Sequence, residues 1–545
     1  MDRHYVIGVD FGTLSGRAIL VDARTGHIEA AKERVYSHGV ITRMPQDQPL
    51  AAGWALQDPA DYLEVLEETI PALLRESGVP GEAVAGLGCD VTSCTILPTL
   101  EDGTPLCHLP PYRNVPHAYV KLWKHHGATG QAFRIENWAR QQEPTLLDRY
   151  GGKVPAQWML PKVLQMLEEA PEVYEQSDLI LEATDWLAYQ LTGEVSRNTC
   201  CAGFKSFWNP KTGYPSKQFL VGLDPRLEDL VPQKLKGKLV EPWERAGFLK
   251  REWAERLGLT TDVAVAGGMI DAHAGVLGSG VTRPGQLLMI LGTSACHMLL
   301  SPQEVAVPGI CGSCRNGILP GYYGYEAGQA CVGDMLDWFV RSHALTANGE
   351  LSREETARLH TMLSQQAACL EPGESGLVAL DWWNGQRTPL VDEQLTGAMV
   401  GMTLRTTPAE QYRALLESAA FGARTILELF EKTGILVEEV VACGGIVGKN
   451  PLMMQIYADV LNRPIKTAAS NQSSALGAAI LGAVAAGIWR DAIQGVEQMT
   501  CPGSVVYTPH PKHVLAYQPL YEIYQKMMED FSRNGMMHQL SALRN

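Results

Sequence analysis

A pattern of two apolar strands joined by a short glycine turn occurs twice in this chain of 545 residues. The first copy comprises residues 5–10, a turn at 11–13 and residues 17–21, and the second comprises residues 285–291, a turn at 292–294 and residues 295–300. A turn this short joins antiparallel strands, because a parallel partner needs a crossover of a dozen or more residues. The repeat predicts two halves of similar design, in which the N–H groups of both turns can face phosphate oxygens.

The first hairpin also excludes the dinucleotide-binding fold, in which a helix follows the glycines. The chain is longer than a single hydrophobic core supports, so at least two domains are expected. Turn residues accumulate at 278–280 and 283–285, and we place the domains at residues 1–280 and 281–545 on that basis.

Composition narrows the class of protein further. The chain is 46% apolar and 19% charged, which is ordinary for a globular protein, and a net charge of −15 with no basic run argues against nucleic acid as a partner. It starts without the features of a signal peptide, and the longest apolar run, residues 478–489, is too short to cross a bilayer. We therefore expect a cytoplasmic protein with no membrane partner.

The twelve cysteines are expected to be reduced thiols in that setting. Cys311 and Cys314 have the spacing of metal ligands. A zinc site would need a second pair, and the sequence offers none, so a structural role for the two cysteines is favoured.

Helical periodicity is clear at residues 60–77 and 408–432, and the second of these runs stops before Gly434. A strand at 438–443 then leads into the glycine loop 444–449, and Asn450-Pro451 is a typical helix start. A glycine loop closed by a helix N-terminus can admit a flat ring and a phosphate. An Ala/Gly-rich helix at 474–487 is expected to pack against this loop.

Two aspartates are candidates for phosphoryl-transfer chemistry, which needs oxygen ligands for Mg²⁺, donors around the phosphates and a base. Asp10 ends a strand beside the first glycine turn, where it can hold Mg²⁺ through water, although the residues alone equally allow an ordinary aspartate turn. Asp271 lies between Ile270 and Ala272, where an unpaired carboxylate is costly to bury. Its residue context leaves two interpretations open, a helix N-cap and a catalytic base. His273 is interpreted as a packed, hydrogen-bonded histidine.

The order Asp-Phe-Gly-Thr, Gly-Gly-x-x-Asp-Ala, Gly-Thr-Ser and Gly-Gly-x-x-x-x-Asn resembles the FGGY family of carbohydrate kinases over essentially the whole chain. The resemblance implies an α/β, two-domain actin-like ATPase fold (ribonuclease H-like), duplicated, with the active site in the interdomain cleft. It implies ATP and Mg²⁺ as cofactors, Asp10 as a metal ligand through water and Asp271 as a possible second ligand. Asp271 matches the family's general base, and the helix N-terminus behind it is expected to help hold its carboxylate ionised and ready to accept the proton.

The same resemblance implies that the two turns and the glycine loop contact ATP. The implied residues are Asp10, Gly12, Thr13, Ser15, Arg17, Gly292, Thr293, Ser294, Gly444, Gly445, Asn450 and Gln455.

For the substrate, residues 88–95, 122–126 and 267–277 resemble the members of the family that phosphorylate L-ribulose at O5 in arabinose breakdown. The implied sugar contacts are Thr92, Ser93, Trp123, Lys205, Asp271 and Glu326. Polar side chains can fix the hydroxyls of a ketopentose while an indole covers its carbon face. The residues alone also allow Trp123 to be a core aromatic and Lys205 to be a solvated surface charge.

Two alternatives to an L-ribulose kinase remain open. One is a kinase for another ketose, such as D-ribulose, xylulose or rhamnulose. The more remote one is an actin-like ATPase that works as a chaperone or filament without sugar kinase activity. A homodimer is compatible with the base rate of symmetric assemblies, but no residue pattern specifies it.

Overall fold

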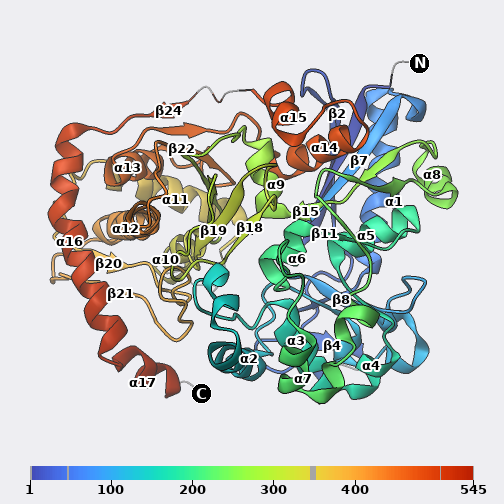
Figure 1. Ribbon diagram of the computed structural model, residues 1–545. Coiled ribbons are helices and arrows are strands. Elements are labelled where there is room, and N and C mark those ends of the chain that lie inside the picture. The colour runs from blue at the N-terminus through green and yellow to red at the C-terminus, as the bar shows by residue number, and fades with distance from the viewer. Residues whose placement is uncertain (1–2, 46–47, 344–350, 502, 504, 544–545) are drawn as a thin grey trace.

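The computed structural model describes residues 3–45, 48–343, 351–501, 503 and 505–543. Its centre consists of two seven-stranded sheets, one from each half of the chain (Figure 1). The first sheet has the order β13-β14-β7-β1-β2-β3, and β15 lies alongside β7. Its strands are β1 (Tyr5–Phe11), β2 (Ser15–Asp22), β3 (Ile28–Val35), β7 (Val84–Val91), β13 (Arg245–Phe248), β14 (Ala264–Ala266) and β15 (Met269–Ile270).

The second sheet has the order β18-β19-β17-β16-β22-β23-β24. Its strands are β16 (Gln286–Leu291), β17 (Ala295–Ser301), β18 (Gly312–Arg315), β19 (Tyr323–Gln329), β22 (Glu439–Cys443), β23 (Ile465–Thr467) and β24 (Val506–Tyr507).

The two sheets repeat one plan. In each, an antiparallel hairpin is extended by a third antiparallel strand on one side and by two parallel strands on the other. The hairpins are β1–β2 and β16–β17, and both occur where the sequence predicts them. The predicted duplication of an α/β unit is therefore confirmed.

A helical insertion, most of which lies between β7 and β13, has its own apolar core, and strand β6, which precedes β7 in the chain, joins its small sheet. Its small sheet has the order β10-β8-β9-β6, with strands β6 (Leu56–Gln57), β8 (Ile96–Thr99), β9 (Val120–Lys121) and β10 (Leu179–Glu182). Its helices are α2 (Thr129–Gln142), α3 (Met159–Glu169), α4 (Pro171–Gln176), α5 (Ala183–Thr192), α6 (Thr199–Lys205) and α7 (Lys217–Leu223). This insertion forms the lower right part of the molecule in Figure 1.

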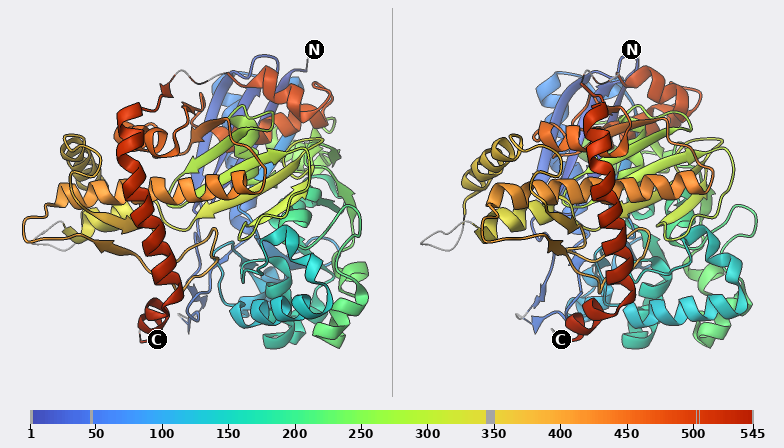
Figure 2. Two further views of the ribbon diagram at one scale, coloured as in Figure 1. Left: turned by 60° about the vertical axis from the view of Figure 1, so that its left-hand side comes forward. Right: turned by 90° about the vertical axis from the view of Figure 1, so that its left-hand side faces the viewer.

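The long helices follow the predicted periodicity. Helix α1 (Ala60–Ser77) packs on β2 and β3, and α12 (Pro408–Lys432) begins with a capping box between Thr407 and Glu410. Figure 2 shows α16 (Pro511–Arg533) crossing the outer side of the second half, where it packs on α13 (Pro451–Leu461). The remaining helices are α8 (Arg251–Leu257), α9 (Asp271–Gly278), α10 (Gly333–His343), α11 (Arg353–Ala367), α15 (Ala492–Met499) and α17 (Met536–Ala542).

The Ala/Gly-rich helix corrects one prediction. Helix α14 (Ser473–Ala485) packs most closely on α9 and on β1 and β7 of the first sheet, whereas the sequence predicted the loop 444–449 as its partner. A Cβ added to Gly88 would lie 2.0 Å from the carbonyl oxygen of Ala478, and one added to Gly278 would lie 1.8 Å from that of Ser473. Glycines facing small residues on α14 thus allow backbones to touch, and one apolar core continues across both halves.

All twelve cysteines are free thiols, as predicted. Over the ranges that the structure describes, every helix is too short or too polar to cross a membrane.

Candidate active site

The first glycine turn is closed by a hydrogen bond from the Gly12 amide to the Ser15 carbonyl, 3.0 Å. Asp10, at the end of β1, is half-buried beside it. Ser15 Oγ and Arg17 Nη2 both donate to Glu33 Oε1 on β3, at 2.7 and 3.2 Å. Glu33 was not predicted, and it fixes two of the side chains assigned to phosphate.

The second turn is built in the same way. The Gly292 amide donates to the Ser294 carbonyl at 2.9 Å, and the Thr293 carbonyl accepts from the amide of Val332 at 2.8 Å. Val332 directly precedes α10, so the start of that helix holds the turn in place.

The glycine loop after β22 touches the second hairpin. Gly444 has a φ of 104°, and a Cβ there would lie 2.4 Å from the Leu291 carbonyl oxygen, so glycine is required for this approach. Gly445 has open space around it. This loop and the second turn therefore form one continuous surface, as an adenosine and phosphate site would need.

Two side chains assigned to adenosine are engaged within the protein. Asn450 caps α13, with Oδ1 accepting from the Met453 amide at 3.0 Å. Gln455 Nε2 donates to Asp459 Oδ1 and to the Thr508 carbonyl, each at 2.9 Å. Their contact with adenosine stays a prediction.

Asp271 is the first residue of α9, and its Oδ1 accepts from the Ala272 amide at 2.7 Å. The N-cap is Ile270, so the N-cap interpretation of Asp271 is wrong. Burial, reinforced by the negative charge of Asp10, raises the pKa of Asp271 to about 7. Burial thus works against the ionised state that the helix N-terminus was expected to help hold.

The carboxylate of Asp271 interacts electrostatically with a residue at each of the two phosphate turns. These residues are Asp10, beside the first turn, and Cys296, two residues beyond Ser294 in the second. A half-buried carboxylate with a pKa near neutrality, placed between two groups of backbone donors, is suited to accept a proton during phosphoryl transfer.

Asp90 is a site residue that the sequence analysis missed. It pairs with Asp10 across the parallel β1–β7 ladder, is fully buried, and its carboxylate oxygens accept no hydrogen bond within the described chain. Burial and the charge of Asp10 raise the pKa of Asp90 well above its usual range, and burial also raises the pKa of Asp10. The sequence did contain a signal for Asp90, because an acidic residue stands out within the otherwise apolar run 84–91.

Lys205 and Glu326 meet between the two halves. Lys205 Nζ lies 2.6 Å from Glu326 Oε2, and both side chains are buried. Arg387 Nη2 binds the other carboxylate oxygen at 2.5 Å, and His273 Nε2 lies 3.3 Å from Oε2. Burial opposes ionisation of Glu326, but the charges of Lys205 and Arg387 and the hydrogen bond with His273 together outweigh it and hold the pKa of Glu326 well below its usual range. Lys205 is therefore not a surface charge.

Cys311, the first member of the cysteine pair, lies at this same contact, whereas Cys314 Sγ contacts the Thr199 carbonyl at 3.6 Å. Cys311 Sγ accepts from Arg387 Nε at 3.0 Å, and the Cys311 carbonyl lies 3.4 Å from Lys205 Nζ. Arg387 is a second residue that the sequence did not identify, because it lies in a loop without a motif.

The remaining sugar candidates flank the first turn. Trp123 is 38% exposed, and its Nε1 donates to Thr13 Oγ1 at 3.0 Å, so it is not a core aromatic. Thr92 and Ser93 lie in the turn that follows β7, where the Thr92 amide donates to the Phe11 carbonyl at 3.2 Å. Thr13 and Trp123, which are 110 residues apart in the sequence, are thus brought together at one edge of the first sheet.

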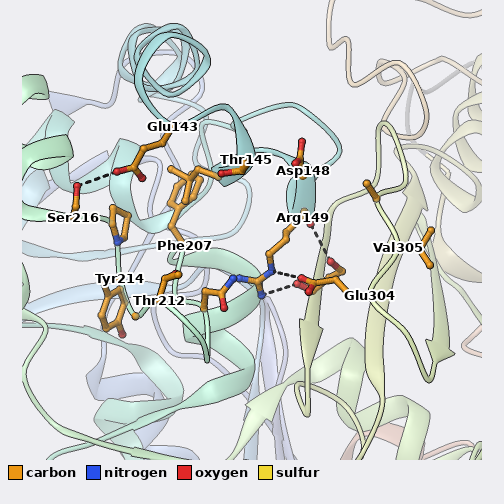
Figure 3. A pocket seen from close by; sticks show the side chains of 16 residues that line it. Glu143, Thr145, Asp148, Arg149, Phe207, Thr212, Tyr214, Ser216, Glu304 and Val305 are labelled. Atoms are coloured by element: carbon orange, nitrogen blue, oxygen red, sulfur yellow. Dashed lines mark hydrogen bonds and ion pairs between the residues drawn. The ribbon is translucent and has the colours of Figure 1, made fainter.

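A separate pocket of about 580 Å³ lies where the helical insertion meets the second half, and none of the predicted site residues lines it. Figure 3 shows Arg149 reaching toward Glu304, with Nε 3.6 Å from Oε1, and Ser216 donating to Glu143 at 3.0 Å. Two of its charged side chains, Arg149 and Glu304, face each other, and we interpret the pocket as a crevice between packed parts.

Comparison with protein families gives a match to each half. The N-terminal domain model of the FGGY family of carbohydrate kinases matches residues 5–278, and the C-terminal domain model matches residues 287–486. The chain belongs to the FGGY family of carbohydrate kinases.

Within that class, the chain is 48% identical to the ribulokinase of Halalkalibacterium halodurans, over 100% of this chain and 98% of that protein. It is also 48% identical to the ribulokinase of Geobacillus thermodenitrificans, over 99% and 97% of the two chains. The solved xylulose kinase of Lactobacillus acidophilus superposes with a TM-score of 0.80 at 20% identity, covering 97% of this chain and 99% of that one. This structural likeness shows the fold alone.

Proposed function

We propose that the protein transfers the terminal phosphoryl group of ATP to O5 of L-ribulose, giving L-ribulose 5-phosphate in L-arabinose catabolism. The observation that carries the proposal is the full-length similarity to ribulokinases. The actin-like ATPase without a sugar substrate is disfavoured, because the chain belongs to a family of carbohydrate kinases.

The residues at the two turns fit a magnesium ion, which we propose as the metal. Asp10 and Asp271 are half-buried carboxylates close enough for one to raise the pKa of the other, and Mg²⁺ prefers such oxygen donors. When bound, Mg²⁺ would supply positive charge to the phosphate oxygens.

The phosphates of ATP are proposed to lie between the turns at Gly12-Thr13 and Gly292-Thr293-Ser294, with adenosine on the loop at Gly444-Gly445. Backbone N–H groups there stabilise the negative charge of the transferring group. The ketopentose is proposed to lie against Trp123, with Lys205 and Glu326 fixing hydroxyls.

Asp271 is the proposed general base. Its carboxylate accepts the proton of the O5 hydroxyl as the oxygen attacks phosphorus, and the bond between that phosphorus and the leaving oxygen of ADP breaks. Approach of the two halves, taken as domains 1–280 and 281–545, would exclude water from the phosphoryl group.

The test is ADP release measured with L-ribulose, D-ribulose, xylulose and rhamnulose, and with no sugar. Highest kcat/KM on L-ribulose is expected. A higher value on another ketose would replace the substrate, and ATP hydrolysis unaffected by any sugar would overturn the kinase assignment.

The proposal also covers the location and the oligomeric state of the protein. A cytoplasmic location follows from the need for ATP, and sedimentation of the purified protein would decide between a monomer and the homodimer.

A further inference from the structure

Lys162 on α3 is a fully buried lysine that the proposed mechanism does not use. Its Nζ donates to the carbonyl oxygens of Cys94 at 2.5 Å, Leu122 at 2.7 Å and Lys121 at 3.3 Å. Among the residues that the structure describes, no carboxylate lies within 4.0 Å of it. Three N–H donors and three backbone acceptors thus satisfy one another without a counter-ion.

Charge on this ammonium is retained at neutral pH. Burial lowers the pKa of Lys162 to about 8, so most molecules carry the proton there. A protonated amine in an apolar surrounding needs all of its donors satisfied, and the three carbonyls do this.

The first carbonyl belongs to the turn that carries the sugar candidates Thr92 and Ser93. Cys94 in this turn has a φ of +55°, a conformation that residues with a side chain rarely adopt and that surrounding contacts must hold. The hydroxyls of Thr92 and Thr95 lie 2.8 Å apart within the same turn. The ammonium of Lys162 is therefore one of the contacts that fix the turn in an unfavourable backbone shape.

The second carbonyl belongs to Leu122, which directly precedes Trp123. Trp123 in turn donates to Thr13 in the first glycine turn. One ammonium thereby ties together two segments, residues 92–95 and 121–123, that are not neighbours in the sequence but both contribute to the proposed sugar site.

We propose that Lys162 is a positioning residue of the sugar site. By binding backbone carbonyls of both, it fixes the turn at residues 92–95 relative to the segment at residues 121–123. It touches neither sugar nor ATP. This inference rests on the proposed function for its effect on the substrate, but its structural part stands independently of which sugar is used.

The test compares Lys162→Met with a matched control, Arg413→Met. Arg413 is also buried, lies on α12 in the second half, and donates to the carbonyls of Ala367 and Leu370 at 3.1 and 3.2 Å, but unlike Lys162 it also pairs with a carboxylate, that of Glu417 at 2.7 Å. Lys162→Met is expected to raise KM for L-ribulose at least about tenfold while KM for ATP changes less than about twofold. Arg413→Met is expected to lower the melting temperature and leave both KM values unchanged.

Hydrogen exchange of the full-length protein without substrate supplies the second readout. Peptides covering residues 91–96 and 120–125 are expected to exchange faster in Lys162→Met and at the normal rate in Arg413→Met. If these peptides loosen but the wild-type protein uses no ketose, the proposed function fails and the positioning role survives.

Lys162→Gln, which keeps two N–H donors, is expected to fold and to give an intermediate KM for L-ribulose. An unchanged KM for the sugar in a folded Lys162 variant, or equal changes in both KM values, would overturn the inference. Failure of both variants to fold would overturn it too, because the lysine would then serve general stability.

Discussion

Lys205 and Glu326 form a buried ion pair of 2.6 Å between the helical insertion and the second sheet. Lys205 comes from α6 and Glu326 from β19, and these elements lie in different halves of the chain. The pair therefore links the sugar candidates to the way in which the halves meet.

Glu326→Leu removes the carboxylate and leaves Lys205 buried without a charged partner. Removing one member of such a pair costs about 3–5 kcal/mol of unfolding free energy. The double variant Lys205→Met/Glu326→Leu should be more stable than Glu326→Leu alone, as measured by denaturant unfolding. Lys211→Met, which breaks the exposed contact of Lys211 with Glu304, should leave the free energy of unfolding nearly unchanged. A double variant less stable than Glu326→Leu would contradict the prediction.

Asp271→Asn keeps the shape of the side chain but cannot accept the proton. We expect kcat to fall about 10²- to 10⁴-fold, the usual contribution of a general base. Calorimetric titration should give nearly unchanged ATP binding. Turnover close to that of the wild type would rule Asp271 out as the base.

The raised pKa of Asp271 predicts a pH profile. Only the ionised carboxylate accepts a proton, so kcat/KM for the sugar should fall about tenfold per pH unit below about pH 7 and level off above it. Steady-state rates between pH 5 and 9 measure this. If the fall in kcat/KM is instead centred near pH 4, the site with its substrates bound must stabilise the ionised carboxylate of Asp271.

Gly88→Ala places a methyl group where the Ala478 carbonyl oxygen of α14 lies at 2.0 Å. Overpacking against backbone should cost at least about 1–3 kcal/mol and lower the melting temperature. Gly130→Ala, on α2 with open space at its Cβ, is the control and should stabilise by up to about 1 kcal/mol. Equal melting temperatures for the two variants would argue against close packing of α14 on β7.

Trp123→Ala removes an exposed indole and its hydrogen bond to Thr13, whereas Trp123→Phe keeps an aromatic face. If the ring covers the sugar, KM for L-ribulose should rise about tenfold in Trp123→Ala and less in Trp123→Phe. Initial rates at varied sugar and saturating ATP would separate the two. Equal effects on both substrates would instead assign the residue to support of the first turn.

The sequence by itself determined the repeated hairpins, the long helices and the approximate positions of the glycine turns, because strand alternation, helix periodicity and turn chemistry act over a few neighbouring residues. The bounds of α1 and α12 follow from such signals. It also determined Asp271 as a candidate, since an acid among apolar residues is unusual wherever it folds.

Only the tertiary structure decided what surrounds those residues. Asp90 acquires its role from the ladder that places it opposite Asp10, Arg387 from a loop that reaches Glu326, and Lys162 from two carbonyls on separate segments. The packing of α14 on the first sheet was decided in the same way. Desolvation and charge depend on which distant groups are brought close, so the neutral-range pKa of Asp271 could not be read from its neighbours in the sequence.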